Sequence, residues 1–299
     1  MHISEKMCNF VATMANKDNL SDKMLRLTLR LTHGRMSASV GDPQTLGNIV
    51  YEPYTLNKSI SPAANLREAF RTSELLKSGY QRALLLTDAP VLLIPQEEYV
   101  AAEAESLYRF TFSVEGSDEI VCSQMPTLSC VAAFAVNKDL LMVAEDHFDD
   151  LRISPLCEPV WTHLYKRSFS GPRQKLFAYF FEKRLCVFRF GQNRFKFCNT
   201  FDAAHDQDAL YYLLFAWRQL GMDVEKDELH LVGEVADEGW LCEQLRQYVR
   251  RVVVMSPQAD FRNIAMAKDA HIPYDLKAVY LDEEGWQLTA LERRQEQEK

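Results

Sequence analysis

The chain has 299 residues, of which 47% are hydrophobic and 25% charged, enough apolar material for a sizeable core. Its formal net charge of −8 argues against nucleic acid as a partner, because phosphate contacts need concentrated lysine and arginine. No run of about 18 apolar residues occurs, so we expect no membrane span.

The first half of the chain predicts strands followed by a helix. Leucines alternate with other residues from 25 to 31, and the turn at His33-Gly34 leads into a second strand. Ser61 is a typical helix N-cap, and Gly79 is a typical helix end. In chain order the pattern predicts strand, strand, strand, helix and central strand over residues 25–31, 36–40, 47–57, 61–79 and 82–88. A strand over 90–95 and a helix over 96–108 are expected next.

The second half repeats this order. Three short strands are expected in 175–201, and the later elements follow as helix, central strand, helix and strand over 206–221, 227–235, 237–250 and 251–257. The first strands of the two halves begin near residues 25 and 176. The helices begin near 61 and 206, and the central strands near 82 and 229. These near-constant offsets predict a duplication with a cleft between the halves, where ligands of open α/β sheets bind.

The element order resembles the actin-like superfamily, in which two ribonuclease-H-like halves surround a nucleotide cleft. It looks most like the pilus-assembly type PilM and its secretion-system relatives, and like an uncharacterised bacterial family of degenerate actin-like proteins. The likeness covers 24–290 and is clearest at 130–169, which predicts strand, helix, strand and helix. The fold class expected is therefore α/β, with two duplicated ribonuclease-H-like halves. The resemblance implies an N-terminal extension over 1–23, a first half over 24–170, and a second half over 171–299 with a charged tail.

The resemblance also implies where a nucleotide would bind. In an actin-like ATPase each half begins with a hairpin whose turn carries Asp and Gly. The glycine lets backbone N–H groups approach phosphate, and the aspartate holds a metal ion through water. Here the first turn keeps Gly34 but has Thr32 or His33 at the aspartate position. The second turn, Glu182-Lys183-Arg184, has neither residue type.

The adenosine-contact strand departs from the family in the same way. The family ends this strand with two glycines, whereas this chain has Gly233 followed by Glu234. A negative side chain would then project where base and phosphates pack. Arg35, Lys183 and Arg184 are the compensating cations of the two turns, enough for one anion.

These departures predict a catalytically inactive actin-like protein, a cytoplasmic interaction or assembly module with a protein partner that the sequence does not name. No catalytic residue, metal or cofactor is assigned, and the oligomeric state stays open. The alternative is a nucleotide-dependent enzyme of the same superfamily, either an ATPase or a small-molecule kinase. The candidate ligand-binding residues of the cleft are His33, Gly34, Arg35, Glu182, Lys183, Arg184, Gly233 and Glu234.

Other reactive side chains favour plain structural interpretations. The acidic segment 145–150 has metal-binding groups, but a solvated acidic face is the stronger interpretation. His205 with Asp202, Asp206 and Asp208 favours capping of the following helix. Seven cysteines without a C-x-x-C pair predict buried, reduced thiols, and these are Cys8, Cys122, Cys130, Cys157, Cys186, Cys198 and Cys242.

Overall fold

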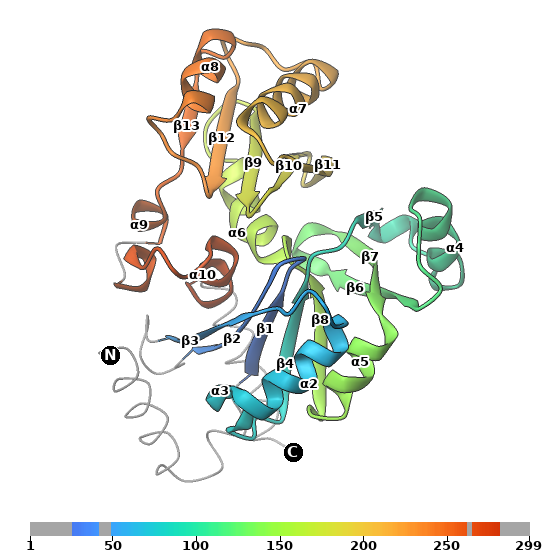
Figure 1. Cartoon of the computed structure of the whole chain (residues 1–299). Coiled ribbons are helices and arrows are strands. Elements are labelled where there is room, and N and C mark those ends of the chain that lie inside the picture. Colours follow the sequence, from blue (N-terminus) through green and yellow to red (C-terminus); the bar gives the residue numbers. More distant parts are fainter. Residues whose placement is uncertain (1–25, 42–48, 262–264, 282–299) are drawn as a thin grey trace, which may run out of the picture.

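The computed structural model describes residues 26–41, 49–261 and 265–281. Its ribbon forms two lobes, with a smaller sheet at the side of the first lobe (Figure 1). The predicted extension over 1–23, Cys8 and the predicted charged tail over 287–299 lie outside the described residues. Within the described part, no helix is both long and apolar enough to cross a bilayer.

The first lobe is built on a sheet in the order β3-β2-β1-β4-β8. β1 pairs antiparallel with β2 and parallel with β4, and β4 pairs parallel with β8. Leu27, Leu29 and Leu31 are buried on one face of β1, as the alternation predicts. The strands are β1 (Arg26–Leu31), β2 (Arg35–Gly41), β3 (Ile49–Thr55), β4 (Arg82–Thr87) and β8 (Asp150–Pro155).

The helix predicted over 61–79 is interrupted in the structure. It divides into α2 (Pro62–Thr72) and α3 (Glu74–Lys77). Ser61 caps the first helix, as predicted, by accepting the Ala64 N–H at 3.2 Å. Ser73 ends α2 in an extended conformation, and its hydroxyl accepts the Leu76 N–H at 3.1 Å to start α3. A second capping serine therefore breaks what the apolar pattern presents as one helix.

The second lobe repeats the first sheet strand for strand, in the order β11-β10-β9-β12-β13. The pairs β9–β10 and β10–β11 are antiparallel, and the pairs β9–β12 and β12–β13 are parallel. The predicted duplication of sheet order is thereby confirmed. The elements are β9 (Lys175–Phe181), β10 (Arg184–Gly191), β11 (Arg194–Asp202), α7 (Asp206–Gln219), β12 (Glu228–Gly233), α8 (Trp240–Tyr248) and β13 (Val252–Val254).

One strand of the predicted duplication belongs elsewhere. The sequence pairs 24–95 with 175–256, so that 90–95 would correspond to the last strand of the second lobe. In the structure β8 holds that edge position, and β5 (Val91–Pro95) joins a separate sheet in the order β5-β7-β6. We call residues 91–137 the insert. Its other elements are η2 (Gln96–Glu98), α4 (Ala101–Thr111), β6 (Asp118–Met125), η3 (Pro126–Leu128) and β7 (Cys130–Asn137).

Helices α6 (Glu158–Ser168) and α10 (Tyr274–Leu281) lie between the lobes (Figure 1). α5 (Lys138–Glu145) and β8 lead into α6, which confirms the pattern predicted for 130–169. After β13 the chain turns back through α9 (Pro257–Asp260) and η4 (Ala265–Lys268) to α10, which packs against α6. The Tyr280 hydroxyl of α10 lies 3.1 Å from the Ser39 hydroxyl of β2. Residues after β13 thus contact the first sheet, and the predicted boundary at 170–171 stays a prediction.

The described cysteines are all free, but they are not all buried. Cys122 of β6 is exposed, contrary to the expectation of buried thiols, because alternate residues of this edge strand point to solvent. Cys198 is half-buried, and the remaining described cysteines, Cys130, Cys157, Cys186 and Cys242, lie in the core.

Candidate functional site: the two hairpin turns

The turn between β1 and β2 presents an imidazole to solvent. His33 Nδ1 lies 3.0 Å from Asp88 Oδ2, and Asp88 directly follows the central strand β4. The side chain of His33 is 69% exposed, whereas that of Asp88 is 5% exposed. The hydrogen bond with Asp88 raises the pKa of His33, and burial only partly opposes this shift. Arg184 of β10 also faces Asp88, at 3.8 Å.

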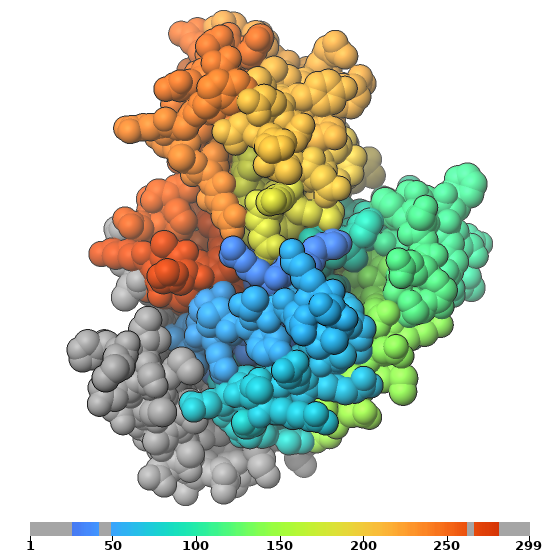
Figure 2. Space-filling model, viewed as in Figure 1, coloured from blue at the N-terminus to red at the C-terminus, as the bar shows by residue number. Residues whose placement is uncertain are grey.

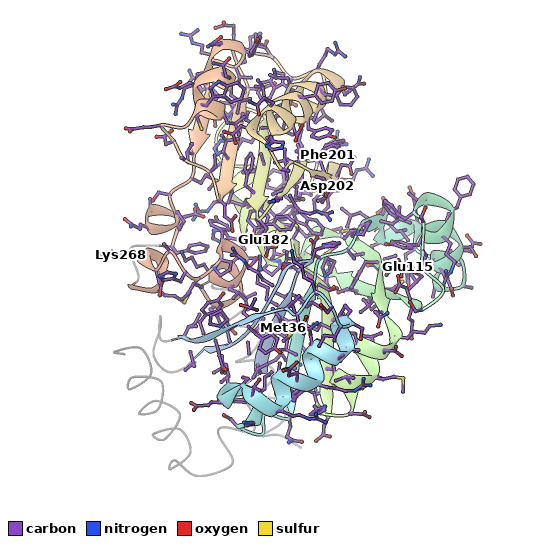
Figure 3. The ribbon with its side chains drawn as sticks, in the orientation of Figure 1. Met36, Glu115, Glu182, Phe201, Asp202 and Lys268 are labelled. Atoms are coloured by element: carbon purple, nitrogen blue, oxygen red, sulfur yellow. The ribbon has the colours of Figure 1, made fainter. Side chains whose placement is uncertain are left out.

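The turn between β9 and β10 reaches across to the first turn. The Thr32 hydroxyl donates a 2.7 Å hydrogen bond to Glu182 Oε1, and Arg30 Nη1 lies 3.3 Å from the same oxygen. A Cβ built on Gly34 would be 4.0 Å from Glu182 Oε2. Glu182 itself has φ of 54°, a left-handed conformation that favours glycine or asparagine. The Glu182 side chain therefore occupies the place between the turns, and Figure 3 labels it there.

The end of β12 completes the site, and its glycine has a structural reason. Gly233 has φ of 91°, and a Cβ there would lie 2.2 Å from the Phe180 carbonyl oxygen. The residue is required for β12 to pair closely with β9, independently of any ligand. Glu234 then turns back, and its carboxylate accepts the backbone N–H of Glu182 at 2.9 Å. The backbone N–H of the second turn is therefore bound by a carboxylate of the same chain.

A buried charge network lies beneath the turns. Arg30 Nε contacts both carboxylate oxygens of Asp275, at 3.0 and 2.9 Å, and the Tyr179 hydroxyl donates to Asp275 at 2.8 Å. Arg30 is 4% exposed and Asp275 is fully buried. Burial acts to lower the pKa of Arg30, but Asp275, Tyr179 and Glu182 together outweigh it and the pKa is raised. The network joins β1 of the first sheet, β9 of the second sheet and α10.

The remaining predicted site residues lie at the rim. Arg35 and Lys183 are exposed. Arg184 is largely buried and lies 3.6 Å from Asp202, whose side chain is exposed at the end of β11 (Figure 3). The sequence did not single out Arg30, Asp88 or Asp275. Asp88 carries a signal, since it follows an apolar central strand, whereas Asp275 sits in an ordinary helical segment without any.

Both acidic segments have structural roles. The expectation of a solvated face at 145–150 is wrong in part, because Asp150 forms ion pairs with Arg26 and Arg82, and the His147 ring stacks on Phe70 with centroids 3.6 Å apart. The capping expectation for the helix after 205 is confirmed, since Asp208 accepts the His205 N–H at 3.3 Å. Throughout the described ranges, no group of three or more His, Cys, Asp or Glu side chains is arranged to hold a metal ion.

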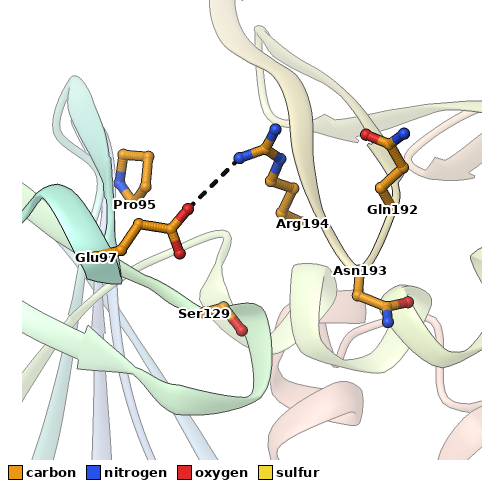
Figure 4. A pocket seen from close by; sticks show the side chains of 6 residues that line it. All are labelled: Pro95, Glu97, Ser129, Gln192, Asn193 and Arg194. Carbon is orange, nitrogen blue, oxygen red and sulfur yellow. Dashed lines mark ion pairs between the residues drawn. The ribbon is translucent and has the colours of Figure 1, made fainter.

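A separate polar pocket of about 390 Å³ lies between the insert and the turn from β10 to β11 (Figure 4). Glu97 of η2 and Arg194 of β11 face each other across it at 3.6 Å. None of its lining residues belongs to the two hairpin turns, and these residues are Pro95, Glu97, Ser129, Gln192, Asn193 and Arg194.

The duplicated sheets define a protein of the actin-like ATPase fold. A protein from Bacteroides thetaiotaomicron VPI-5482, described as having an actin-like ATPase fold and unknown function, superposes with a TM-score of 0.76 at 23% sequence identity. The match covers 89% of this chain and 99% of that one. Residues 15–252 match the family described as "Protein of unknown function (DUF3822)", and the chain belongs to that family.

Two further structures match at lower similarity. The PilM–PilN type IV pilus biogenesis complex matches with a TM-score of 0.49 at 11% identity, over 89% of this chain and 98% of that one. The cytoplasmic domain of EpsL, an inner membrane component of the type II secretion system of Vibrio cholerae, matches with a TM-score of 0.38 at 16% identity. This match covers 75% of this chain and 94% of that one. Among proteins with curated descriptions, none matches the sequence.

Proposed function

We propose that this chain is a catalytically inactive actin-like protein that works as an interaction or assembly module. The observation that carries the proposal is the 2.7 Å hydrogen bond from Thr32 to Glu182, which joins the two turns directly. A nucleotide bound as in the actin-like ATPases would have to place its phosphates between these turns. It would first have to displace a carboxylate that two groups of the first lobe already hold, Thr32 and Arg30.

Electrostatics supports the same proposal. Glu182 and Glu234 both place a carboxylate where polyphosphate would lie, and like charges repel. The Arg30 guanidinium is shared with Asp275, so its charge is already balanced within the chain. Arg35 and Lys183 remain at the rim as exposed cations, which would hold an anion only loosely.

A protein partner and a cytoplasmic location are the finer parts of the proposal. The net charge of −8 favours a partner other than nucleic acid. The six described cysteines are all free, which suits a reducing compartment.

The alternative, a nucleotide-dependent enzyme, has one observation in its favour. His33 is held by the buried carboxylate of Asp88 while most of its ring faces solvent, an arrangement that suits a general base. An ATPase or a small-molecule kinase would use such a base to activate water or a hydroxyl group. The proposal and this alternative differ in whether ATP binds at all.

Titration calorimetry with ATP and Mg²⁺ tests the proposal, together with an assay for released phosphate. We expect the wild type to bind no tighter than about 100 μM, equivalent to roughly −5.5 kcal/mol, and to release no phosphate. Glu234→Gly is the comparison variant, because it restores the second glycine of the family pattern. Low-micromolar binding by the wild type, with turnover lost in His33→Gln, would contradict the proposal and establish the enzyme.

A further inference from the structure

Helix α4 of the insert leaves an apolar face uncovered. One side of the helix is held by the insert, with Ala104 and Tyr108 buried and the Tyr108 hydroxyl donating to the Pro90 carbonyl at 2.9 Å. Another side exposes Val100 by 50%, Leu107 by 45% and Phe110 by 92%. An aromatic ring gains much of its stabilising effect from burial, so a nearly fully exposed phenylalanine beside a leucine indicates a contact surface. The helix stands out from the body of the molecule in Figure 2.

The spacing of these residues indicates the shape of the partner. Glu103, Leu107 and Phe110 follow the i, i+4, i+7 pattern of a seam along which a second helix packs. Val100, the extended N-cap residue of α4, precedes this seam, and Glu103 is exposed at its start; we call the seam the α4 face. With a rise of about 1.5 Å per residue, α4 offers roughly 16 Å, enough for about three turns of a partner helix.

The charge of the insert indicates the chemistry of the partner. Arg109 is the single basic residue in 91–137, against seven acidic ones, so the insert has a formal charge of −6 within a chain of −8. Figure 3 labels one of these acidic residues, Glu115, beside α4. Two copies of this surface, or the surface and an anionic membrane, would repel each other. The acidic residues are Glu97, Glu98, Glu103, Glu105, Glu115, Asp118 and Glu119.

We propose that the α4 face docks a basic amphipathic α-helix of a partner protein. Apolar residues of that helix would cover Leu107 and Phe110, and a lysine or arginine would pair with Glu103. The surrounding acidic residues would speed association and favour cationic partners. This inference rests on the proposed function as an interaction module, and it names the place and the chemistry of the interaction.

The test uses the full chain and a defined probe. The probe is a dye-labelled 18-residue peptide with leucine at positions a and d of its heptads and lysine elsewhere. A matched peptide carries glutamate in place of every lysine. Fluorescence anisotropy should show micromolar binding of the lysine peptide, weakened at least about tenfold when salt rises from 50 to 500 mM. The glutamate peptide should bind at least about tenfold more weakly than the lysine peptide, because the insert repels it.

Matched variants locate the binding. The double variant Leu107→Ser/Phe110→Ser should lower the affinity for the lysine peptide at least about tenfold. Glu103→Lys should lower this affinity about threefold to tenfold. Met142→Ser is the control, because Met142 is a 61% exposed apolar side chain on α5, outside the insert. It should leave the affinity unchanged. Circular dichroism and melting temperature establish that each variant is folded, which these exposed positions allow.

Three results would overturn the docking site. They are no binding of the lysine peptide up to 1 mM, equal binding of the two peptides, or undiminished binding by the Leu107→Ser/Phe110→Ser variant. The result is independent of the nucleotide experiment, because the peptide and ATP are measured separately on different surfaces. Tight ATP binding would contradict the inactive cleft and leave the peptide result standing. A failed peptide test without ATP binding would remove the α4 face alone.

Discussion

The carbonyl oxygen of Phe180 lies 2.2 Å from where a Cβ on Gly233 would be. The strand β12 therefore pairs with β9 only if residue 233 has no side chain, and its φ of 91° adds a second reason for glycine. A glycine that resembles a nucleotide-binding feature in the sequence is thus explained by backbone packing alone.

Gly233→Ala should destabilise the protein by roughly 2–4 kcal/mol, because overpacking adds about 1–3 kcal/mol to the cost of a left-handed residue. Gly79→Ala is the matched control. It has φ of 79° but no atom within 4 Å of the new Cβ, so it should cost about 1 kcal/mol. Urea unfolding of both variants measures the difference. Equal costs would show that the contact with Phe180 relaxes freely.

Asp275→Asn should lower the free energy of unfolding by about 3–5 kcal/mol, because it leaves the buried Arg30 without its main counter-charge. Glu225→Gln removes an ion pair with Arg250 whose side chains are 62% and 66% exposed, and it should change stability by less than about 1 kcal/mol. Chemical denaturation of the two variants side by side is the measurement. A loss below about 1 kcal/mol for Asp275→Asn would show that the network does not hold the lobes together.

The pKa values of His33 and His230 should be shifted in opposite directions. The hydrogen bond with Asp88 raises the pKa of His33, whereas burial lowers the pKa of His230. NMR titration should place His33 above and His230 below the usual value of about 6.5, and Asp88→Asn should lower the His33 pKa. An unchanged His33 pKa in Asp88→Asn would contradict the pairing.

The His33 pairing also predicts a pH dependence of stability. Because its folded-state pKa is raised, protonated His33 contributes stability that is fully present below about pH 6.5. That contribution is lost as the pH rises through the folded-state pKa. His33→Asn should therefore destabilise the protein more at pH 5.5 than at pH 8.5, by less than about 1 kcal/mol since the ring is largely exposed. A larger effect at high pH would reverse the assigned sign.

Alkylation of the native protein should distinguish its cysteines. Cys122 is exposed and should react with iodoacetamide, whereas burial raises the pKa of Cys130 to about 12 and shields its sulfur. Peptide mass spectrometry before and after unfolding in urea gives the labelled fraction at each position. Cys130 should be labelled only after unfolding. Equal labelling of both thiols in the native state would mean that the insert opens readily.

The sequence predicts the fold well because local patterns of apolar residues determine where the strands and helices lie. Alternating leucines in β1 and the apolar run of β4 recur in the second lobe with nearly constant spacing, and the sheet order follows from that repeat. The position of β5 could not be predicted, since nothing in 91–95 distinguishes an edge strand of the insert from the fifth strand of the first sheet. The break at Ser73 depends on a cap that the helical pattern hides.

The candidate site is less predictable because its contacts join distant parts of the chain. The departures at Glu182 and Glu234 are visible in the sequence, but the contact of Glu182 with Thr32 depends on how the lobes close. The alternation in β1 places Arg30 opposite the leucines without showing that α10 buries that face. Long-range pairing of this kind has no local signature.

The same pairing has a consequence during synthesis. Arg30 and Asp275 are 245 residues apart, so a ribosome adding about 5–20 residues per second needs roughly 12–50 s to supply the aspartate after the arginine. For that interval the guanidinium of Arg30 lacks its main counter-ion, Asp275. The nascent first lobe must keep this guanidinium in contact with water or with a chaperone. Final closure of the molecule is then a late event, governed by when α10 emerges.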